Sequence, residues 1–293
     1  MISISLPKPF AQEHLFQYLR RSKNEITFRV LDDNTIIKLF VINNTHLLSK
    51  IRFSSEAINI SFINQKPSAA QTLEIEHYVI SWFDLNTDLN SFYEQVKDDA
   101  ILGSIINNFS GLRIVRCPDL FEALSWSIIG QQINLPFAYS CKKALVQIVG
   151  ESINIEGEIH YAFPTPDKVL ELSDEDFRVI KFSSQKVKYI RIVAEAIEAG
   201  SLSKESLELL DFKQAKEELL KLKGIGNWSA NYTLMRCLGY KEAFPIADVG
   251  LQNALKLILK KSEKPSIEEI YEMAIPWKGW EAYATFYLWQ TLL

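Results

Sequence analysis

Residues 222–248 read LKGIGNWSANYTLMRCLGYKEAFPIAD, and the fold expected for the rest of the chain follows from this stretch. Just before it, residues 215–222 place leucines among lysines and glutamates, a pattern typical of the end of an amphipathic helix. Gly224 and Gly226 then flank Ile225. The glycines let the backbone turn sharply and approach a partner closely, while the isoleucine can anchor the turn in the core.

A second helix is predicted directly after this turn. Trp228, Tyr232 and Met235 recur at helical spacing, and Gly239 is placed to end the helix. The unit is therefore helix, hairpin, helix. The free N–H groups at the start of the second helix, together with its positive dipole end, favour a phosphate group. Such binding would be independent of base sequence, because no hairpin side chain reads a base.

Asp248 lies 20 positions after Trp228 and follows a loop that contains Pro245. It can cap the apolar helix that carries Leu251 and Leu255. Short glycine turns and capping aspartates also occur in proteins that never bind nucleic acid. On these residues alone, a purely structural role is an alternative to a functional one.

The string LKGIGNWSANY, followed by an Asp after a proline-containing loop, resembles the helix-hairpin-helix DNA glycosylase superfamily, and within it the 3-methyladenine DNA glycosylase II branch. A further string, GLRIVRCPDLFEALSWSIIGQQI at residues 111–133, matches the same family in the same order. The resemblance implies an α+β N-terminal domain followed by an all-α glycosylase core. It also implies an enzyme of base excision repair that flips a damaged base out of double-stranded DNA.

The resemblance assigns roles to particular residues. Asp248 would stabilise the oxocarbenium-like transition state and activate water while the N-glycosidic bond of an alkylated purine is hydrolysed. An aromatic pocket for the positively charged base is assigned to Trp228, Tyr232 and Trp289. The DNA backbone would be held by the hairpin residues Gly224, Ile225 and Gly226, with Lys223 as an adjoining cation.

The turn at residues 130–134 is the second functional candidate. By resemblance it supplies the side chain that fills the gap left by the extruded nucleotide, assigned to Gln132 with Ile133 as the alternate. Polar residues in an exposed turn are the structural alternative. The helix before this turn is predicted to begin with a capping box of Asp119 and Glu122.

Two departures from the family pattern bear on the activity. Bifunctional members carry a nucleophilic lysine two residues after the second hairpin glycine, where this chain has Trp228. The resemblance therefore implies a monofunctional glycosylase without lyase activity. Where the best-known members of the branch have an aromatic residue after the catalytic Asp, this chain has Val249, which bears on the substrate range.

The pattern along the chain predicts its division into domains. In residues 1–84, β-branched runs alternate with turns rich in Asn and Asp, such as Asn43–Asn44, which indicates an antiparallel sheet with helices. Residues 85–293 are predicted to be all-α, with one subdomain at about 112–240 and a second formed by about 85–111 and 241–293. Residues 151–164 are predicted to be a loop. Trp280 and Tyr283 are expected to pack the closing helix against the core.

Composition limits the remaining possibilities. The 293 residues are 47% hydrophobic, yet no apolar run is long enough for a membrane span and no signal peptide is recognisable. We therefore expect a cytoplasmic, nucleoid-associated monomer of a prokaryote with no membrane partner. Three distant cysteines predict neither disulfides nor a metal site, and no cofactor is expected. An ion at the hairpin carbonyls is implied by the resemblance alone.

The net charge of −4 is the main observation against a nucleic-acid partner, because DNA binding is largely electrostatic. Local cations and backbone N–H groups can still hold a few phosphates. Two alternatives stay open: the same fold acting on 8-oxoguanine, uracil or hypoxanthine, and a non-catalytic helix-hairpin-helix DNA-binding protein. A binder has no need of a carboxylate near the negatively charged backbone, so Asp248 discriminates between binder and enzyme.

Overall fold

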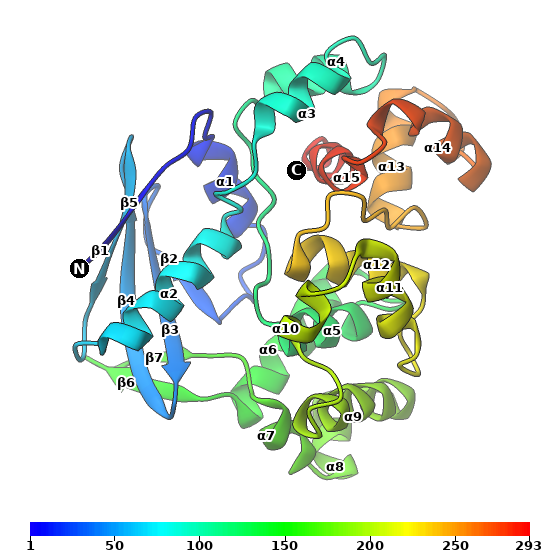
Figure 1. The fold of residues 1–293 in the computed structure, drawn as a ribbon. Coiled ribbons are helices and arrows are strands. Elements are labelled where there is room, and N and C mark those ends of the chain that lie inside the picture. Colours follow the sequence, from blue (N-terminus) through cyan, green and yellow to red (C-terminus); the bar gives the residue numbers. More distant parts are fainter.

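The computed structural model describes all residues, 1–293, and places an antiparallel sheet beside a mostly helical region (Figure 1). The sheet has the order β1-β5-β4-β3-β2, and all its neighbours are antiparallel. Its strands are β1 Ile2–Ser5, β2 Phe28–Val30, β3 Thr35–Ile42, β4 Thr45–Phe53 and β5 Ala57–Phe62. The predicted turn between β3 and β4 is confirmed: Asn43 and Asn44 both adopt positive φ, as a two-residue hairpin of this kind requires.

Two helices complete the N-terminal part, α1 Gln12–Leu19 and α2 Ala69–Trp82. The sequence pattern did not predict the second helix, although Ser68 and Gln71 form a full capping box at its start. Apolar residues of the sheet and of both helices belong to a single core of 68 buried residues that continues through the helical region. The sheet and the helices are therefore held against each other by a shared apolar core.

The prediction of a loop at residues 151–164 is wrong. These residues form a β-hairpin, β6 Ser152–Ile155 and β7 Glu158–Tyr161, joined by Glu156 and Gly157, which both have positive φ. Its apolar side chains, Ile153 and Ile155, pack on a small second cluster on the sheet, made of Ile37, Leu39 and Leu48. The hairpin is stable because it covers this otherwise exposed sheet face, which local sequence patterns do not reveal.

The rest of the chain is helical and forms two groups in Figure 1. The first group contains α5 Leu120–Ile129, α6 Leu135–Val149, α7 Pro166–Leu170, α8 Asp174–Val179, α9 Ser184–Glu198, α10 Lys204–Glu208, α11 Phe212–Leu220, α12 Asn227–Thr233 and the π-helical turn η1 Leu234–Leu238. The second contains α3 Leu89–Val96, α4 Leu102–Asn108, α13 Val249–Ile258, α14 Ile267–Met273, the 3-10 turn η2 Ile275–Trp277 and α15 Glu281–Gln290. None of the helices is long and apolar enough to cross a bilayer.

The closing helix α15 packs as predicted, with Trp280 and Tyr283 both buried. The capping box predicted for α5 is wrong in one half. Asp119 accepts the backbone N–H of Glu122 at 2.6 Å, but the Glu122 side chain turns away to the ammonium group of Lys142. A buried cation offers this carboxylate a stronger partner than a backbone N–H group.

Candidate functional site

The hairpin between α11 and α12 has the predicted geometry. Gly224 has φ +100°, and a Cβ atom there would lie 2.2 Å from the ring of Tyr189, so only glycine fits. Ile225 is buried, as an anchor should be. Gly226 begins α12 and has open space around it, and no side chain caps the first N–H groups of this helix. The hairpin therefore presents uncapped backbone donors at an open surface.

The turn after α5 lies directly against this hairpin. The side-chain amide of Gln131 donates to the carbonyl oxygen of Gly224 at 2.9 Å and to Ser229 Oγ at 3.3 Å. Gln132 is exposed and has φ +57°, whereas Ile133 is partly buried and packs on the core. Of the two predicted wedge residues, Gln132 is therefore the one that projects from the surface. The bridging role of Gln131 was missed.

Asp248 is the N-cap of α13, as predicted, and accepts hydrogen bonds from three N–H groups. Its Oδ1 accepts the backbone N–H of Leu251 and the indole N–H of Trp289, both at 2.8 Å. Its Oδ2 accepts the indole N–H of Trp228 at 3.0 Å. Both predicted pocket tryptophans are thus bound to the predicted catalytic carboxylate and fix its orientation. No sequence signal indicated this link.

The three predicted pocket aromatics lie together. Trp228 stacks on Tyr232 with ring centroids 5.4 Å apart, and Tyr232 faces Trp289 at 6.4 Å with the planes tilted by 36°. Tyr232 is buried and the two tryptophans are partly buried. The tryptophans come from α12 and α15, which belong to different helix groups, so the site lies where these groups meet.

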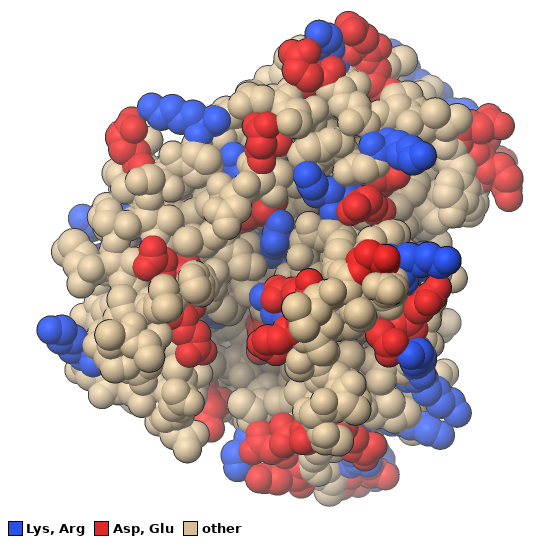
Figure 2. Space-filling view, viewed as in Figure 1, with Lys and Arg blue, Asp and Glu red and all other residues tan.

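The face of the molecule shown in Figure 2 carries mixed charge. Acidic and basic residues alternate on the face shown in Figure 2, and acidic residues predominate at its lower end, where Figure 1 places α7 and α8. Lys223 beside the hairpin is exposed and makes no ion pair, whereas the nearby Lys221 is held by Glu218 at 2.6 Å. Lys223 is therefore available to an anion at the hairpin.

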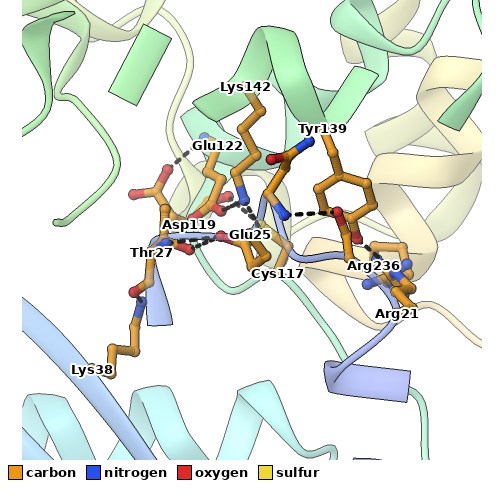
Figure 3. A network of polar contacts seen from close by, with 12 residues as sticks. Arg21, Glu25, Thr27, Lys38, Cys117, Asp119, Glu122, Tyr139, Lys142 and Arg236 are labelled. Carbon is orange, nitrogen blue, oxygen red and sulfur yellow. Dashed lines mark hydrogen bonds and ion pairs between the residues drawn. The ribbon is translucent and has the colours of Figure 1, made fainter. Parts of the chain in front are cut away.

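A polar network lies between the sheet and the helices (Figure 3). Lys142 reaches Glu25 and Glu122, each at 2.7 Å, and all three side chains are buried. Burial lowers the pKa of Lys142, but the two carboxylates outweigh it, so that the net shift is upward. This ion triad ties the segment after α1 to α5 and α6.

Comparison with known proteins places this geometry in a family. Residues 125–279 match the HhH-GPD superfamily of base excision DNA repair proteins, and residues 3–124 match the N-terminal domain of 8-oxoguanine DNA glycosylase. The chain belongs to the HhH-GPD superfamily. It is 41% identical over its whole length to a DNA-3-methyladenine glycosylase of Bacillus subtilis, of which it covers 97%.

Solved structures share the fold of this HhH-GPD chain. The 3-methyladenine DNA glycosylase of Archaeoglobus fulgidus superimposes with a TM-score of 0.85 at 22% identity, covering 99% of this chain and 97% of the other. An 8-oxoguanine glycosylase/lyase of Clostridium acetobutylicum, solved in complex with double-stranded DNA, gives 0.74 at 22% identity, with coverage of 96% and 91%. The predicted fold class, an α+β N-terminal domain before a helical glycosylase core, is confirmed, although the core is mostly and not all helical because it contains the β6–β7 hairpin.

The predicted metal position can be tested against the hairpin itself. No group of three or more metal-binding side chains occurs in the structure. The carbonyl oxygens of Leu222 and Gly224 already accept from Ile225 N–H and from the Gln131 amide. Each of these carbonyl oxygens keeps a second lone pair that a cation could use, and an ion at the hairpin stays a prediction.

Proposed function

We propose that this HhH-GPD protein is a monofunctional DNA glycosylase that hydrolyses the N-glycosidic bond of alkylated purines of the 3-methyladenine type. The observation that carries the proposal is the carboxylate of Asp248, held between the indole N–H groups of Trp228 and Trp289 beside an aromatic cluster. The full-length relative of Bacillus subtilis, named DNA-3-methyladenine glycosylase, supports the same substrate class.

The chemistry follows from the charge of this carboxylate. As the glycosidic bond breaks, positive charge develops on the sugar, and an oriented carboxylate stabilises it and can activate the attacking water. Asp248 is oriented before substrate binds, because its three N–H partners leave it little freedom. An alkylated purine already carries positive charge and is a good leaving group. The reaction therefore needs no second carboxylate as a general acid.

The base is proposed to stack between Tyr232 and Trp289. A base between two rings needs them about 7 Å apart, twice the van der Waals separation of about 3.5 Å. The ring centroids are 6.4 Å apart and the planes are tilted by 36°, so the two rings must move apart and become more parallel to admit a base into this slot. Aromatic faces attract a cationic base, which gives the slot a preference for alkylated purines.

The DNA is proposed to be held by its backbone and opened by a wedge. The N–H groups after Gly226 and the exposed Lys223 would bind phosphates of double-stranded DNA. Gln132 would fill the space left by the flipped nucleotide, and its neighbour Gln131 sets its distance from the hairpin. A protein that works this way needs one copy per lesion, so we propose a monomer.

No strand cleavage is proposed, because Trp228 occupies the position of the nucleophilic lysine and its indole nitrogen donates to Asp248. The decisive experiment measures bases released from methylated duplex DNA by the wild type and by Asp248→Asn, with strand integrity examined before and after alkali. We expect methylpurines and alkali-dependent breaks from the wild type, and a rate lower by roughly 10²–10³ from Asp248→Asn.

The matched control is Asp211→Asn. Asp211 caps α11 in the same way that Asp248 caps α13, but it has no aromatic partners, so this change should leave base release intact. Equal activity of Asp248→Asn and wild type would refute the proposal. Duplex binding without any base release by the wild type would instead favour a non-catalytic DNA-binding protein.

A further inference from the structure

A small cavity lies next to the aromatic slot. Its volume is about 60 Å³, and Tyr232 belongs to both its wall and the slot. A single water needs roughly 10–15 Å³ of such space, so the cavity has room for an exocyclic group and a few waters, not for a whole purine. The cavity is lined by side chains of the sheet domain and of α5, α6 and α12 with η1.

Hydrogen-bond donors outnumber acceptors in the part of the cavity wall formed by Arg236, Tyr232, Arg21 and Tyr139. Arg236 is 5% exposed and donates through Nη1 to the hydroxyl oxygen of Tyr232 at 3.2 Å, but its buried Nε–H has no partner. The Tyr232 hydroxyl proton has no acceptor either. Tyr139 accepts from Arg21 Nε at 2.5 Å and likewise finds no acceptor for its own proton. An occupant with acceptor atoms would satisfy these donors.

The cavity wall also carries positive charges that no carboxylate neutralises. Its carboxylates, Glu25 and Glu122, are both used by Lys142, and the guanidinium of Arg116 is paired with Asp84. Neither Arg21 nor Arg236 has a carboxylate within ion-pair distance. Figure 3 shows these two arginines at the end of the network away from Lys38. A buried guanidinium without an anion is costly, so the site favours a neutral or negative group over a positive one.

Arg236 also has a defined relation to the slot. It lies one turn beyond Tyr232 along the chain, and the hydrogen bond between the two side chains shows that they point the same way. Its guanidinium lies 5.4 Å from the centroid of the Tyr232 ring. Arg236 belongs to the π-helical turn η1, a type of local distortion that is frequent at functional sites.

We infer that Arg236 is a specificity-determining residue that binds the acceptor edge of an extruded neutral purine, such as one with a ring carbonyl group. The inference rests on the proposed function. The aromatic slot alone favours a cationic base, whereas the Arg236 guanidinium, hydrogen-bonded to Tyr232, opposes a cation and can donate to a carbonyl oxygen. The enzyme should then accept both alkylated purines and neutral carbonyl purines, with Arg236 setting their ratio.

The test uses two duplexes of identical sequence, one with a single 7-methylguanine and one with a single hypoxanthine, each opposite cytosine. Single-turnover base release is measured for the wild type, Arg236→Met and Arg236→Lys. We expect Arg236→Met to slow hypoxanthine release about ten- to hundred-fold, the contribution of a hydrogen bond from a charged group. Release of 7-methylguanine should stay unchanged or become faster. Arg236→Lys should retain more hypoxanthine release than Arg236→Met.

The matched control is Arg191→Met, since Arg191 also lies 5.4 Å from an aromatic ring, that of Phe177, but does not line the cavity. It should leave both rates unchanged. Thermal unfolding and binding to a duplex with a tetrahydrofuran abasic analogue verify that each variant is folded and binds DNA. If Arg236→Met does not fold, Tyr232→Phe removes one donor of the same set and should shift the ratio in the same direction.

Two results for Arg236→Met would overturn the inference. If the rates of release fall equally for both bases, the role of Arg236 is purely structural. If neither rate changes, Arg236 has no role in base release. A wild type that releases 7-methylguanine but not hypoxanthine would also overturn it, while the proposed function would stand. A wild type that binds the duplex and releases neither base would instead refute the proposed function.

Discussion

The indole N–H of Trp289 donates a 2.8 Å hydrogen bond to Oδ1 of Asp248, across 41 positions of the chain. Trp228 donates to the other carboxylate oxygen from a different helix. Two aromatic residues of the proposed base pocket therefore also orient the group proposed to stabilise the transition state. Substrate stacking and catalysis are coupled through these two side chains, and this coupling leads to the first prediction.

Trp228→Phe should keep an aromatic ring against Tyr232 but remove one donor to Asp248. A hydrogen bond to a charged group contributes about 1.5–3 kcal/mol, so we expect single-turnover release of 7-methylguanine to fall about ten-fold or more. Trp280→Phe is the control, because Trp280 is buried against Phe92 and Tyr283 and donates no hydrogen bond to Asp248. Equal rates for Trp228→Phe and wild type would show that the indole N–H is not needed for orientation.

Gly224→Ala should damage both the fold of the hairpin and DNA binding. The new Cβ would overlap the Tyr189 ring, and φ +100° is strained for alanine by about 1–3 kcal/mol. Chemical denaturation should therefore show a lower free energy of unfolding. Gly226→Ala is matched to it, because Gly226 has φ −94° and a methyl group added there would meet no atom within 4 Å. The free energy of unfolding of Gly226→Ala should stay within about 0.5 kcal/mol of the wild-type value.

Lys223→Ala should remove one phosphate contact. The slope of log K against log salt concentration for a duplex should become shallower by about one, without a change in stability. Lys221→Ala provides the comparison, since Lys221 is already paired with Glu218 and should leave the slope unchanged. The same slope for Lys223→Ala and wild type would place the phosphate elsewhere.

Lys142→Met should destabilise the protein by about 3–5 kcal/mol, because it leaves Glu25 and Glu122 buried without their cation. The free energy of unfolding from urea titrations measures this. Base release by the folded fraction should be retained, because the ion triad makes no contact with Asp248. Loss of activity beyond the loss of folded protein would show that the triad also shapes the slot.

Lys142→Met should also reverse the direction in which the free energy of unfolding changes with pH. Burial raises the pKa of Glu25, but Lys142 and Thr27 outweigh it, so the folded value lies below the ordinary 4.5. A lowered pKa stabilises the fold above pH 4.5, and this stabilisation is lost as the pH falls through the folded value. In Lys142→Met burial dominates, so stability should rise as the pH falls from about 7 to about 5. Parallel curves of unfolding free energy against pH for Lys142→Met and the wild type would contradict this.

Features that depend on near neighbours along the chain could be predicted from the sequence. The glycine hairpin, the Asp248 cap and the Asn43–Asn44 turn were predicted because φ preferences and capping bonds act over a few residues. The family resemblance added the roles of the hairpin, the aromatic residues and Asp248, since it rests on strings that lie in the same order in the family.

How these pieces meet depends on tertiary packing and could not be predicted. The Gln131 amide reaches the hairpin across 93 positions, and the β6–β7 hairpin is stable only because the sheet offers it an apolar face. Arg236 reads as an ordinary helical cation until folding buries it beside Tyr232 without a carboxylate. Such contacts are set by the packing of separate elements, and no local pattern in the sequence encodes the distance between them.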